Sequence, residues 1–338
     1  MSESPGVYEM AGAAPMRKTV TLVSVVVPIF NEEDGLDYLF DRLLTVFKQA
    51  DLAYEIICVN DGSRDFSLEK LIEFHHQNPA IKVINLSRNF GKEVALTAGI
   101  DFATGDVVIP IDADLQDPPE LILDMIEQWQ AGFDVVYATR RSRQGESFAK
   151  KLTASAFYQT IGRMTKIKIP PNTGDFRLMD RQVVEALKQL PERTRFMKGL
   201  FTWVGFRQTA IVFDREPRHQ GISKWNYWKL WNFALDGIFS FSFIPLQIWS
   251  YLGLLVSTIS LTYALFLVIR TLLFGIDLPG YASLMVAVLF LGGVQLISLG
   301  VIGEYLARVY EETKERPLYF VRDVYGLQQG PQNFPTRH

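Results

Sequence analysis

The sequence contains a single cysteine, Cys58, among its 338 residues. A lone cysteine excludes an intrachain disulfide and any metal site built from several thiolates. Cys58 lies in an apolar run, so we expect it to be a small residue of the hydrophobic core. The chain also lacks an excess of either charge, with 34 basic and 37 acidic residues. This balance gives no reason to expect nucleic acid as a partner.

Charge is absent from two long stretches near the C-terminus, Gly237 to Ile269 and Leu278 to Gly303, although 21% of all residues are charged. A helix that spans a bilayer needs about 20 apolar residues. Pro245 separates a short lead-in from the first run. We therefore predict two transmembrane helices, at about 245–269 and 279–304, joined as a hairpin by a short connector. Two buried helices of a soluble core are the alternative, but two such uncharged stretches in succession would be unusual in water.

Basic residues flank the predicted hairpin on one side of the membrane. Lys224 and Lys229 precede the first helix, and Arg308, Lys314 and Arg316 follow the second. The positive-inside rule then places the preceding domain and both termini in the cytoplasm. The expected location is the bacterial inner (plasma) membrane.

Two further segments, near 148–164 and 224–236, mix basic and aromatic residues as interfacial helices do. Ordinary amphipathic surface helices fit segment 148–164 equally well. Gly292, Gly300 and Gly303 could allow close helix contact, so we expect a homo-oligomer.

The first two thirds of the chain alternate short apolar runs with amphipathic segments. Such alternation predicts an α/β fold with a doubly wound, mostly parallel sheet. We expect a disordered leader at 1–18, a cytosolic domain at 19–235, the helix pair within 237–305, and a cytosolic C-terminal tail at 306–338. The strands are predicted at 22–27, 54–59, 81–86, 107–111 and 134–138, and helical patterns start near 36, 68 and 118.

Polar clusters follow four of these strands, where ligands bind in open α/β sheets. The clusters begin at Pro28, Asn60, Ser87 and Asp112. In an extended backbone, residues i and i+2 point the same way, so Asp112 and Asp114 would face one point. Two carboxylates ~5 Å apart repel by about 3 kcal/mol at an effective dielectric of 20. Bound Mg²⁺ or Mn²⁺ would relieve this repulsion. The alternative is a solvated acidic turn in which Asp117 caps the helix that Pro118 and Pro119 open.

Taken together, Asn31-Glu32, Asp61 and Asp112-x-Asp114 resemble the family 2 glycosyltransferases of the GT-A fold. The segments 172–177 (NTGDFR) and 218–224 (RHQGISK), the helix hairpin and the Arg316 to Tyr319 tail extend the likeness over about residues 20 to 325. The chain is similar to the polyisoprenyl-phosphate glycosyltransferases, near the bactoprenol glucosyltransferases and the dolichol-phosphate mannose synthases. It lacks the Gln-x-x-Arg-Trp of processive polysaccharide synthases, which favours transfer of a single sugar.

The resemblance implies a role for each matching residue. The loop from Pro28 through Asn31 to Glu32 would hold the nucleoside with Asp61, and Lys92 is a further nucleotide-site candidate. Asp112 and Asp114 would hold the metal and the diphosphate. Asp175 would lie close to the transferred sugar, where we expect it to orient metal or sugar more than to take a proton. The remaining two, Arg218 and Lys224, would bind the acceptor phosphate.

The implied reaction is transfer of one hexose, glucose from UDP-glucose, to undecaprenyl (polyisoprenyl) phosphate with inversion. Mannose from GDP-mannose, or an amino sugar, remains an alternative. An inactive membrane scaffold that recruits a partner such as a lipid flippase is a reading of a different class, and the intact acids oppose it. A nicotinamide dehydrogenase is excluded more strongly, because Pro28 and Asn31 stand where its Gly-x-Gly-x-x-Gly would be.

Overall fold

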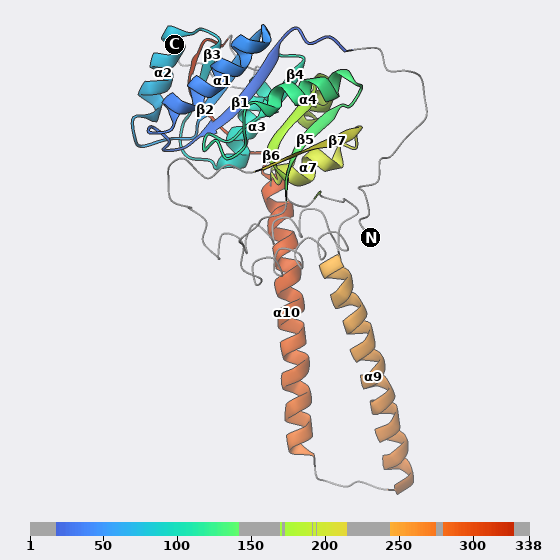
Figure 1. Ribbon diagram of the computed structural model, residues 1–338. Helices are drawn as coiled ribbons and strands as arrows, with labels where there is room; N and C mark the ends of the chain where they lie inside the picture. The colour runs from blue at the N-terminus through green and yellow to red at the C-terminus, as the bar shows by residue number, and fades with distance from the viewer. Residues whose placement is uncertain are drawn as a thin grey trace.

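The structure is a computed structural model that describes residues 18–141, 170, 173–190, 192–193, 195–214, 244–274 and 280–327. It consists of a sheet-based domain from which two long helices extend to one side (Figure 1). Residues 1–17 of the leader predicted at 1–18, and both predicted interfacial segments, lie outside the described residues. Lys18, which was predicted to belong to the leader, is part of the domain, because its ammonium lies 2.8 Å from both Asp134 and Asp180.

The domain is built on one sheet of eight strands in the order β7-β5-β6-β4-β1-β2-β3-β8. The five predicted strands are all present, with ends that differ from the prediction by at most two residues, and β6, β7 and β8 were not predicted. Pairing is parallel in β1–β2, β1–β4, β2–β3 and β5–β7, and antiparallel wherever β6 or β8 takes part. The strands are β1 (Val23–Ile29), β2 (Tyr54–Asn60), β3 (Ile81–Leu86), β4 (Val107–Pro110), β5 (Val135–Arg140), β6 (Thr173–Asp180), β7 (Gln208–Phe213) and β8 (Val321–Tyr325).

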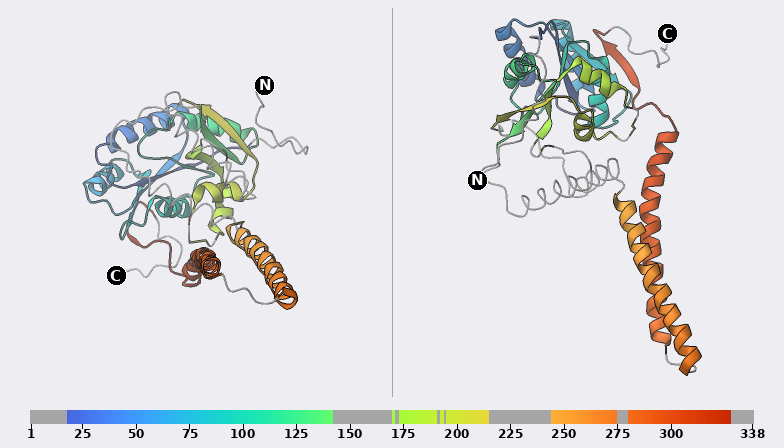
Figure 2. Two further views of the ribbon diagram at one scale, coloured as in Figure 1. Left: turned by 90° about the horizontal axis from the view of Figure 1, so that it is seen from below. Right: turned by 90° about the vertical axis from the view of Figure 1, so that its right-hand side faces the viewer.

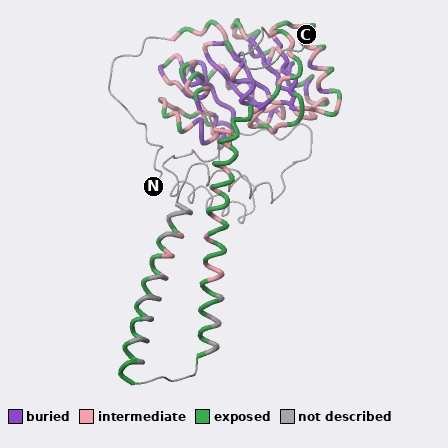
Figure 3. Tube along the Cα trace, turned by 180° about the vertical axis from the view of Figure 1, so that it is seen from behind, coloured by how far each residue is buried: buried purple, intermediate pink, exposed green. Residues whose placement is uncertain are grey.

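Helices cover both faces of this sheet, so its central strands are apolar on successive residues. In β1, Val25 and Val27 pack into one core and Val26 into the other. The first core also contains Cys58, which is fully buried as predicted. Figure 3 shows the buried residues concentrated in the sheet-based domain. One face carries α1 (Leu36–Ala50), α2 (Ser67–Gln77) and α4 (Leu121–Gln130); the other carries α3 (Lys92–Phe102), α6 (Arg181–Lys188) and α7 (Met197–Trp203).

Strand β6 is inserted between β4 and β5 and runs antiparallel to both. Val107 pairs with Asp180 and Val108 with Met179. Asp175 lies further along β6, beyond these pairs, and its carboxylate contacts the same Lys92 ammonium as Asp112. The reversed strand therefore delivers an acid to the rim where the parallel strands end.

Within the tail predicted at 306–338, the described residues 306–327 do not form a separate tail, because α10 continues to Thr313 and β8 joins the sheet. Strand β8 closes the β3 edge of the sheet, with Ile84 paired to Val324. The segment before it is also tied to the domain, since the Tyr319 hydroxyl donates to Asp101 at 2.8 Å. Arg193 donates its backbone N–H to Glu312 at 2.7 Å. The chain thus leaves the domain and returns to it.

The part of the chain between β7 and β8 contains the hairpin of α9 (Ile244–Phe274) and α10 (Tyr281–Thr313). The helices point away from the sheet in Figure 1 and in the right-hand view of Figure 2, and each is longer than predicted. Many of their large apolar side chains are exposed, including Leu272 at 80% and Leu296 at 72%. Among the described residues, the segment Phe290–Thr313 has the length and apolar composition of a membrane span.

Candidate active site

The candidate site lies at the rim where β1, β2 and β4 end and β6 begins. Asp61 directly follows β2 and is only 2% exposed. Its carboxylate accepts hydrogen bonds from the backbone N–H groups of Phe90 at 2.7 Å and Gly91 at 2.9 Å. Burial raises the pKa of Asp61, although these two donors and nearby Arg88 act in the opposite direction. Asp61 thus fixes the loop that leads from β3 to α3.

Gly62 allows this loop to approach. Its φ of +66° lies in the left-handed region, and a Cβ here would lie 2.6 Å from the backbone nitrogen of Asn89. Both the conformation and the contact therefore require glycine. The close approach of the two loops places Asp61 beside the start of α3.

The predicted nucleoside loop is shorter than expected. Pro28 belongs to β1, where it pairs with Val59, and the loop begins after Ile29. Asn31 has a φ of 54°; its backbone N–H donates to Ser63 Oγ at 3.0 Å, and its side-chain oxygen accepts from Arg64 N at 2.8 Å. Asn31 therefore joins the loop after β1 to the loop after β2.

Glu32 continues this connection. Its backbone N–H donates to Ser67 Oγ at 3.0 Å. Asn31, Glu32 and Asp61 thus lie on two adjoining loops, and Pro28 lies on β1 just before the first of them. Contact of these four residues with a nucleoside stays a prediction.

Asp112 and Asp114 lie in a turn and not on an extended strand, so the argument from alternating side chains was wrong. Strand β4 ends at Pro110, and Leu115, with a φ of 51°, ends the turn. Asp114 accepts from Gln116 N at 3.2 Å. Asp112 instead forms an ion pair with Lys92, whose Nζ lies 2.7 Å from Asp112 Oδ1. Turn geometry, and not strand alternation, positions the two acids.

Lys92 also contacts Asp175, so it joins three parts of the chain. Its Nζ lies 2.6 Å from Asp175 Oδ2. Desolvation lowers the pKa of Lys92, but Asp112 and Asp175 outweigh it and hold this pKa well above its usual value. Burial acts to raise the pKa of Asp175, and the cations Lys92, Lys198 and Arg177 overcome it, so this pKa lies below its usual range. Asp175 is therefore a charged acid at neutral pH.

The second oxygen of Asp175, Oδ1, is buried and has no hydrogen-bond partner among the residues that the structure describes. A buried polar atom without a partner is costly, and its presence calls for an explanation. Here the atom belongs to a charged carboxylate whose other oxygen already holds an ammonium. Such an oxygen fits a cation or a sugar hydroxyl supplied by a bound substrate.

Two residues of the site were missed by the sequence analysis. Glu93 follows Lys92, and its carboxylate accepts from Met197 N at 3.3 Å. Burial and the charge of Asp175 raise its pKa to about 7, against the opposing effect of Lys92 and Lys198. The signal available in the sequence was an acid beside Lys92 at the start of a helix whose other residues are mostly apolar.

Arg177 is the second missed residue, although it lies in the quoted segment 172–177. It is 4% exposed, donates to the Gly174 carbonyl at 2.9 Å, and lies 4.1 Å from the Phe201 ring centre. Burial lowers its pKa to about 10. It remains a cation at neutral pH, and together with Lys92 it balances Asp175.

Asp117 has a different role from the predicted one. Helix α4 starts at Leu121, and Asp117 does not cap it. Asp117 is 4% exposed and lies 3.4 Å from Arg140 Nη2. It therefore ties the loop after β4 to the end of β5, which borders the site.

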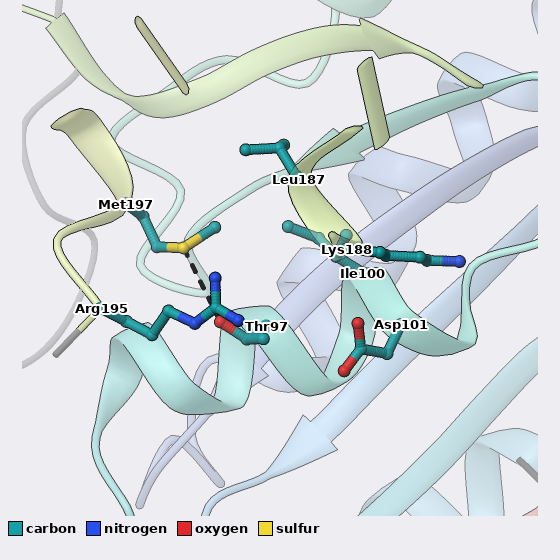
Figure 4. Close-up of a pocket in the computed structure, with 7 residues that line it drawn as sticks. All are labelled: Thr97, Ile100, Asp101, Leu187, Lys188, Arg195 and Met197. Carbon is teal, nitrogen blue, oxygen red and sulfur yellow. Dashed lines mark hydrogen bonds between the residues drawn. The ribbon is translucent and has the colours of Figure 1, made fainter. Parts of the chain in front are cut away.

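Arg218 and Lys224 lie outside the described residues, so their role as acceptor ligands stays a prediction. A small cavity between α3, α6 and α7 (Figure 4) has a volume of about 10 Å³ and is lined by Thr97, Asp101 and Arg195 among others. A space of this size holds one water at most. It is a packing defect behind α3 and not a substrate site.

No cluster of three or more His, Cys, Asp or Glu side chains within the described part of the chain is arranged to hold a metal alone. Mg²⁺ and Mn²⁺ sites commonly take only one or two carboxylates and complete their ligands with phosphate oxygens and water. The oxygen-only set of Asp112 and Asp114, with Asp175 Oδ1 nearby on β6, fits such a substrate-completed site.

A mixed, mostly parallel sheet with acids at this rim is the architecture of a GT-A glycosyltransferase. Residues 24–188 match the family described as Glycosyl transferase family 2, and residues 244–309 match the GtrB C-terminal hairpin. An uncharacterized glycosyltransferase of Synechocystis is 68% identical over 309 residues, which cover 91% of this chain and 97% of that protein. The chain therefore belongs to glycosyl transferase family 2 and carries the GtrB type of hairpin.

The bactoprenol glucosyl transferase of Shigella phage SfV is also similar, with 48% identity over 301 residues that cover 89% of this chain and 98% of that one. Among solved structures, glucosyl-3-phosphoglycerate synthase from Mycobacterium tuberculosis, in complex with Mn²⁺, UDP and glucosyl-3-phosphoglycerate, has a TM-score of 0.45 and 18% identity. That match covers 65% of this chain and 78% of the synthase.

Proposed function

We propose that this enzyme transfers glucose from UDP-glucose to undecaprenyl phosphate, with inversion, at the cytoplasmic face of the membrane. The observation that carries the proposal is the similarity to bactoprenol glucosyl transferases, which extends through the catalytic domain and the hairpin. A similarity limited to the domain would support only sugar transfer. The hairpin adds a reason to expect a lipid-linked acceptor.

The donor would bind along the rim described above. The loops of Asn31 and Glu32, together with Asp61, would enclose the nucleoside. Asp112 and Asp114 would hold Mg²⁺ or Mn²⁺ with the diphosphate. The metal, when bound, stabilises negative charge on the departing diphosphate. The junction of Asp61, Lys92, Asp112 and Asp175 at one rim supports this assignment.

The acceptor chemistry agrees with the acids that the site contains. A phosphate monoester has a second pKa near 6 and is mostly a dianion at pH 7, so it attacks without a general base. One acceptor oxygen bonds to the anomeric carbon while the bond from that carbon to the UDP oxygen breaks, and the electron pair leaves with UDP. No proton has to move. The low pKa of Asp175 supports a role in orienting a cation or the sugar.

Membrane orientation is the second part of the proposal. The basic residues on both flanks of the hairpin favour a cytoplasmic catalytic domain and cytoplasmic termini. Undecaprenyl phosphate would then approach from the inner leaflet, and Arg218 and Lys224 would bind its phosphate.

The test is transfer of radiolabelled sugar from a panel of nucleotide sugars to undecaprenyl phosphate in detergent, with and without Mg²⁺ or Mn²⁺. We expect organic-soluble label from UDP-glucose only, in the presence of metal, and a loss of at least about 100-fold in Asp114→Asn. Label from GDP-mannose or a UDP-amino sugar would replace the assigned donor. Folded protein that binds UDP-glucose but forms no product with any acceptor would favour the scaffold function.

Asp175→Asn separates two roles within the same assay. Asparagine keeps the size of the side chain but removes the charge that Lys92 contacts. We expect the turnover rate of the variant to be much lower than that of wild type at every pH. The shape of its pH profile should match wild type, because the substitution removes no proton transfer. Turnover equal to wild type would contradict any essential role for Asp175.

A further inference from the structure

Lys92 places its ammonium between two carboxylates of the site. Its Nζ lies 2.7 Å from Asp112 Oδ1 and 2.6 Å from Asp175 Oδ2. Asp112 lies in the turn after β4 and Asp175 lies on β6, and both carboxylates contact this one ammonium. The ammonium therefore neutralises a pair of carboxylates that would otherwise repel each other.

The side chain of Lys92 is partly open to solvent. It is 43% exposed, whereas the Asp175 side chain is only 7% exposed. Lysine carries its charge on a flexible four-carbon stem and makes no fixed bidentate contact. The backbone, by contrast, is anchored, because the preceding Gly91 N–H donates to Asp61 at 2.9 Å. A fixed backbone with a mobile ammonium is suited to a change of partner.

A metal bound with the donor diphosphate would need the same carboxylates that Lys92 holds. Asp112 is a predicted metal ligand, and Asp175 Oδ1, beside the ion pair, is a buried oxygen that no described residue contacts through a hydrogen bond. A divalent cation that arrives alone would have to displace Lys92 without offering it another anion. A cation that arrives with a diphosphate brings two negative phosphates to which Lys92 can turn.

We propose that Lys92 is a positioning residue that exchanges partners: it holds Asp112 and Asp175 in the donor-free enzyme and moves to the donor diphosphate when metal and nucleotide bind together. Lys92 thereby keeps free divalent cations out and makes metal binding depend on the nucleotide. The inference rests on the proposed function in one respect, since it takes the donor to be a nucleotide diphosphate sugar.

The test compares Mn²⁺ binding, measured by electron paramagnetic resonance, with UDP binding, measured by calorimetry, in the full-length protein in detergent. For Lys92→Met without nucleotide, we expect Mn²⁺ to bind about tenfold or more tightly than in wild type, because a competing charge is gone. With Mn²⁺ present, we expect the same variant to bind UDP about tenfold more weakly. Lys92→Arg keeps the charge and should lie closer to wild type in both measurements.

Lys198→Met is the matched control. Lys198 lowers the pKa of Asp175 through its charge, as Lys92 does, but it is not bonded to Asp112 or Asp175 within the described structure. We expect it to change Mn²⁺ affinity by less than Lys92→Met. An equal effect would show that general charge, and not exchange of partners, governs the site, and would overturn the inference.

Mn²⁺ affinity that is unchanged or weaker in Lys92→Met would overturn it as well. A form of the test that needs no variant uses wild type alone, where UDP should tighten Mn²⁺ binding at least about tenfold. Independent binding of the two would contradict the proposal even if Lys92→Met failed to fold. These outcomes do not depend on glucose transfer, so a failure of the proposed function remains distinguishable.

Discussion

At the scale of single residues, the site separates two neighbouring acids by their environments. Asp175 lies against the Lys92 ammonium, and its pKa falls below the usual range. Glu93 forms no such direct ion pair with the described residues, and burial next to the Asp175 charge raises its pKa to about 7. Pairs of acids whose pKa values are driven apart are typical of functional sites. Asp175 thus stays charged, while Glu93 changes its charge near neutral pH.

Glu93→Gln should change how the stability of the protein depends on pH. A glutamate has an unfolded pKa of about 4.3, so folded Glu93 holds a proton that the unfolded chain has lost between about pH 4.3 and 7. The contribution of Glu93 to stability therefore falls as pH rises through this window. Glutamine can still accept from Met197 N but does not ionise. We expect the Tm of the variant minus the Tm of wild type to increase from pH 5 to pH 8. Thermal unfolding in detergent at both pH values would measure this difference.

Asp106→Asn is a control with the opposite sign. Burial acts to raise the pKa of Asp106, but the hydrogen bonds from Thr21 and Leu22 outweigh it and lower this pKa. Its stabilising effect is present above the usual pKa of aspartate and is lost only in acid. Asp106→Asn should therefore lower the Tm at both pH 5 and pH 8. A Glu93→Gln effect that did not vary with pH would rule out the raised pKa.

The residues of the site were partly predictable from sequence. Asp61 and Asp112 follow strong apolar runs, and a parallel sheet gathers such strand ends at one rim. The partnership of Lys92 with Asp175 was not predictable, because it depends on the antiparallel register of β6, 83 residues further along the chain. The pKa values of Glu93 and Arg177 are shifted by burial and by nearby charges. Neither effect can be predicted before the fold is known.

At the scale of elements, the parallel strands were predicted because burial on both faces makes them apolar on successive residues. Strand β6 has the sequence TGDFRLMD and β8 has VRDVY. Polar residues in both interrupt the apolar pattern that identifies a strand. In β6 they serve the site. In β8, Asp323 accepts from Asn85 on the neighbouring strand at 2.9 Å, so tertiary contacts supply what the local pattern lacks.

The segment between α10 and β8 offers a prediction about one of these contacts. Tyr319 is 5% exposed, and its hydroxyl donates to Asp101 on α3 at 2.8 Å. A buried hydrogen bond to a charged acceptor contributes about 1.5–3 kcal/mol. We expect Tyr319→Phe and Asp101→Asn each to destabilise the domain, and the double variant to lose less than the sum. Urea unfolding followed by tryptophan fluorescence would measure the coupling, and strict additivity would show that the bond contributes nothing.

At the scale of the whole molecule, the hairpin lies within the catalytic fold and does not follow it. The chain enters α9 after β7, leaves α10 at Thr313, and returns to pair β8 with β3. Within the described residues, the β3 edge of the sheet is thus completed by a strand that follows the helix hairpin. An open β3 edge would present unpaired backbone groups, which favours aggregation.

This arrangement predicts that two ways of removing the hairpin have different outcomes. A chain that ends at residue 243 lacks β8, so we expect it to aggregate because β3 is uncovered and Asn85 loses Asp323. A chain in which a Gly/Ser linker replaces residues 244–313 keeps β8, so we expect it to fold and to be more soluble. Long flexible connections cost little, since each doubling of a loop costs about 0.6 kcal/mol. Size-exclusion chromatography and thermal unfolding would compare the two directly.

The linker variant also separates donor binding from acceptor use. The rim that contains Asp61, Lys92 and Asp112 remains intact in it, so UDP should bind with an affinity within about threefold of wild type, as expected for a distant and independent change. Transfer to undecaprenyl phosphate in vesicles should fall far more, because the variant has lost the segment that keeps it at the bilayer. If transfer in vesicles remained equal to wild type, the hairpin would not be needed to reach the lipid. If UDP binding were lost in folded protein, the hairpin would instead support the donor site through β8, β3 and the loop that holds Asp61.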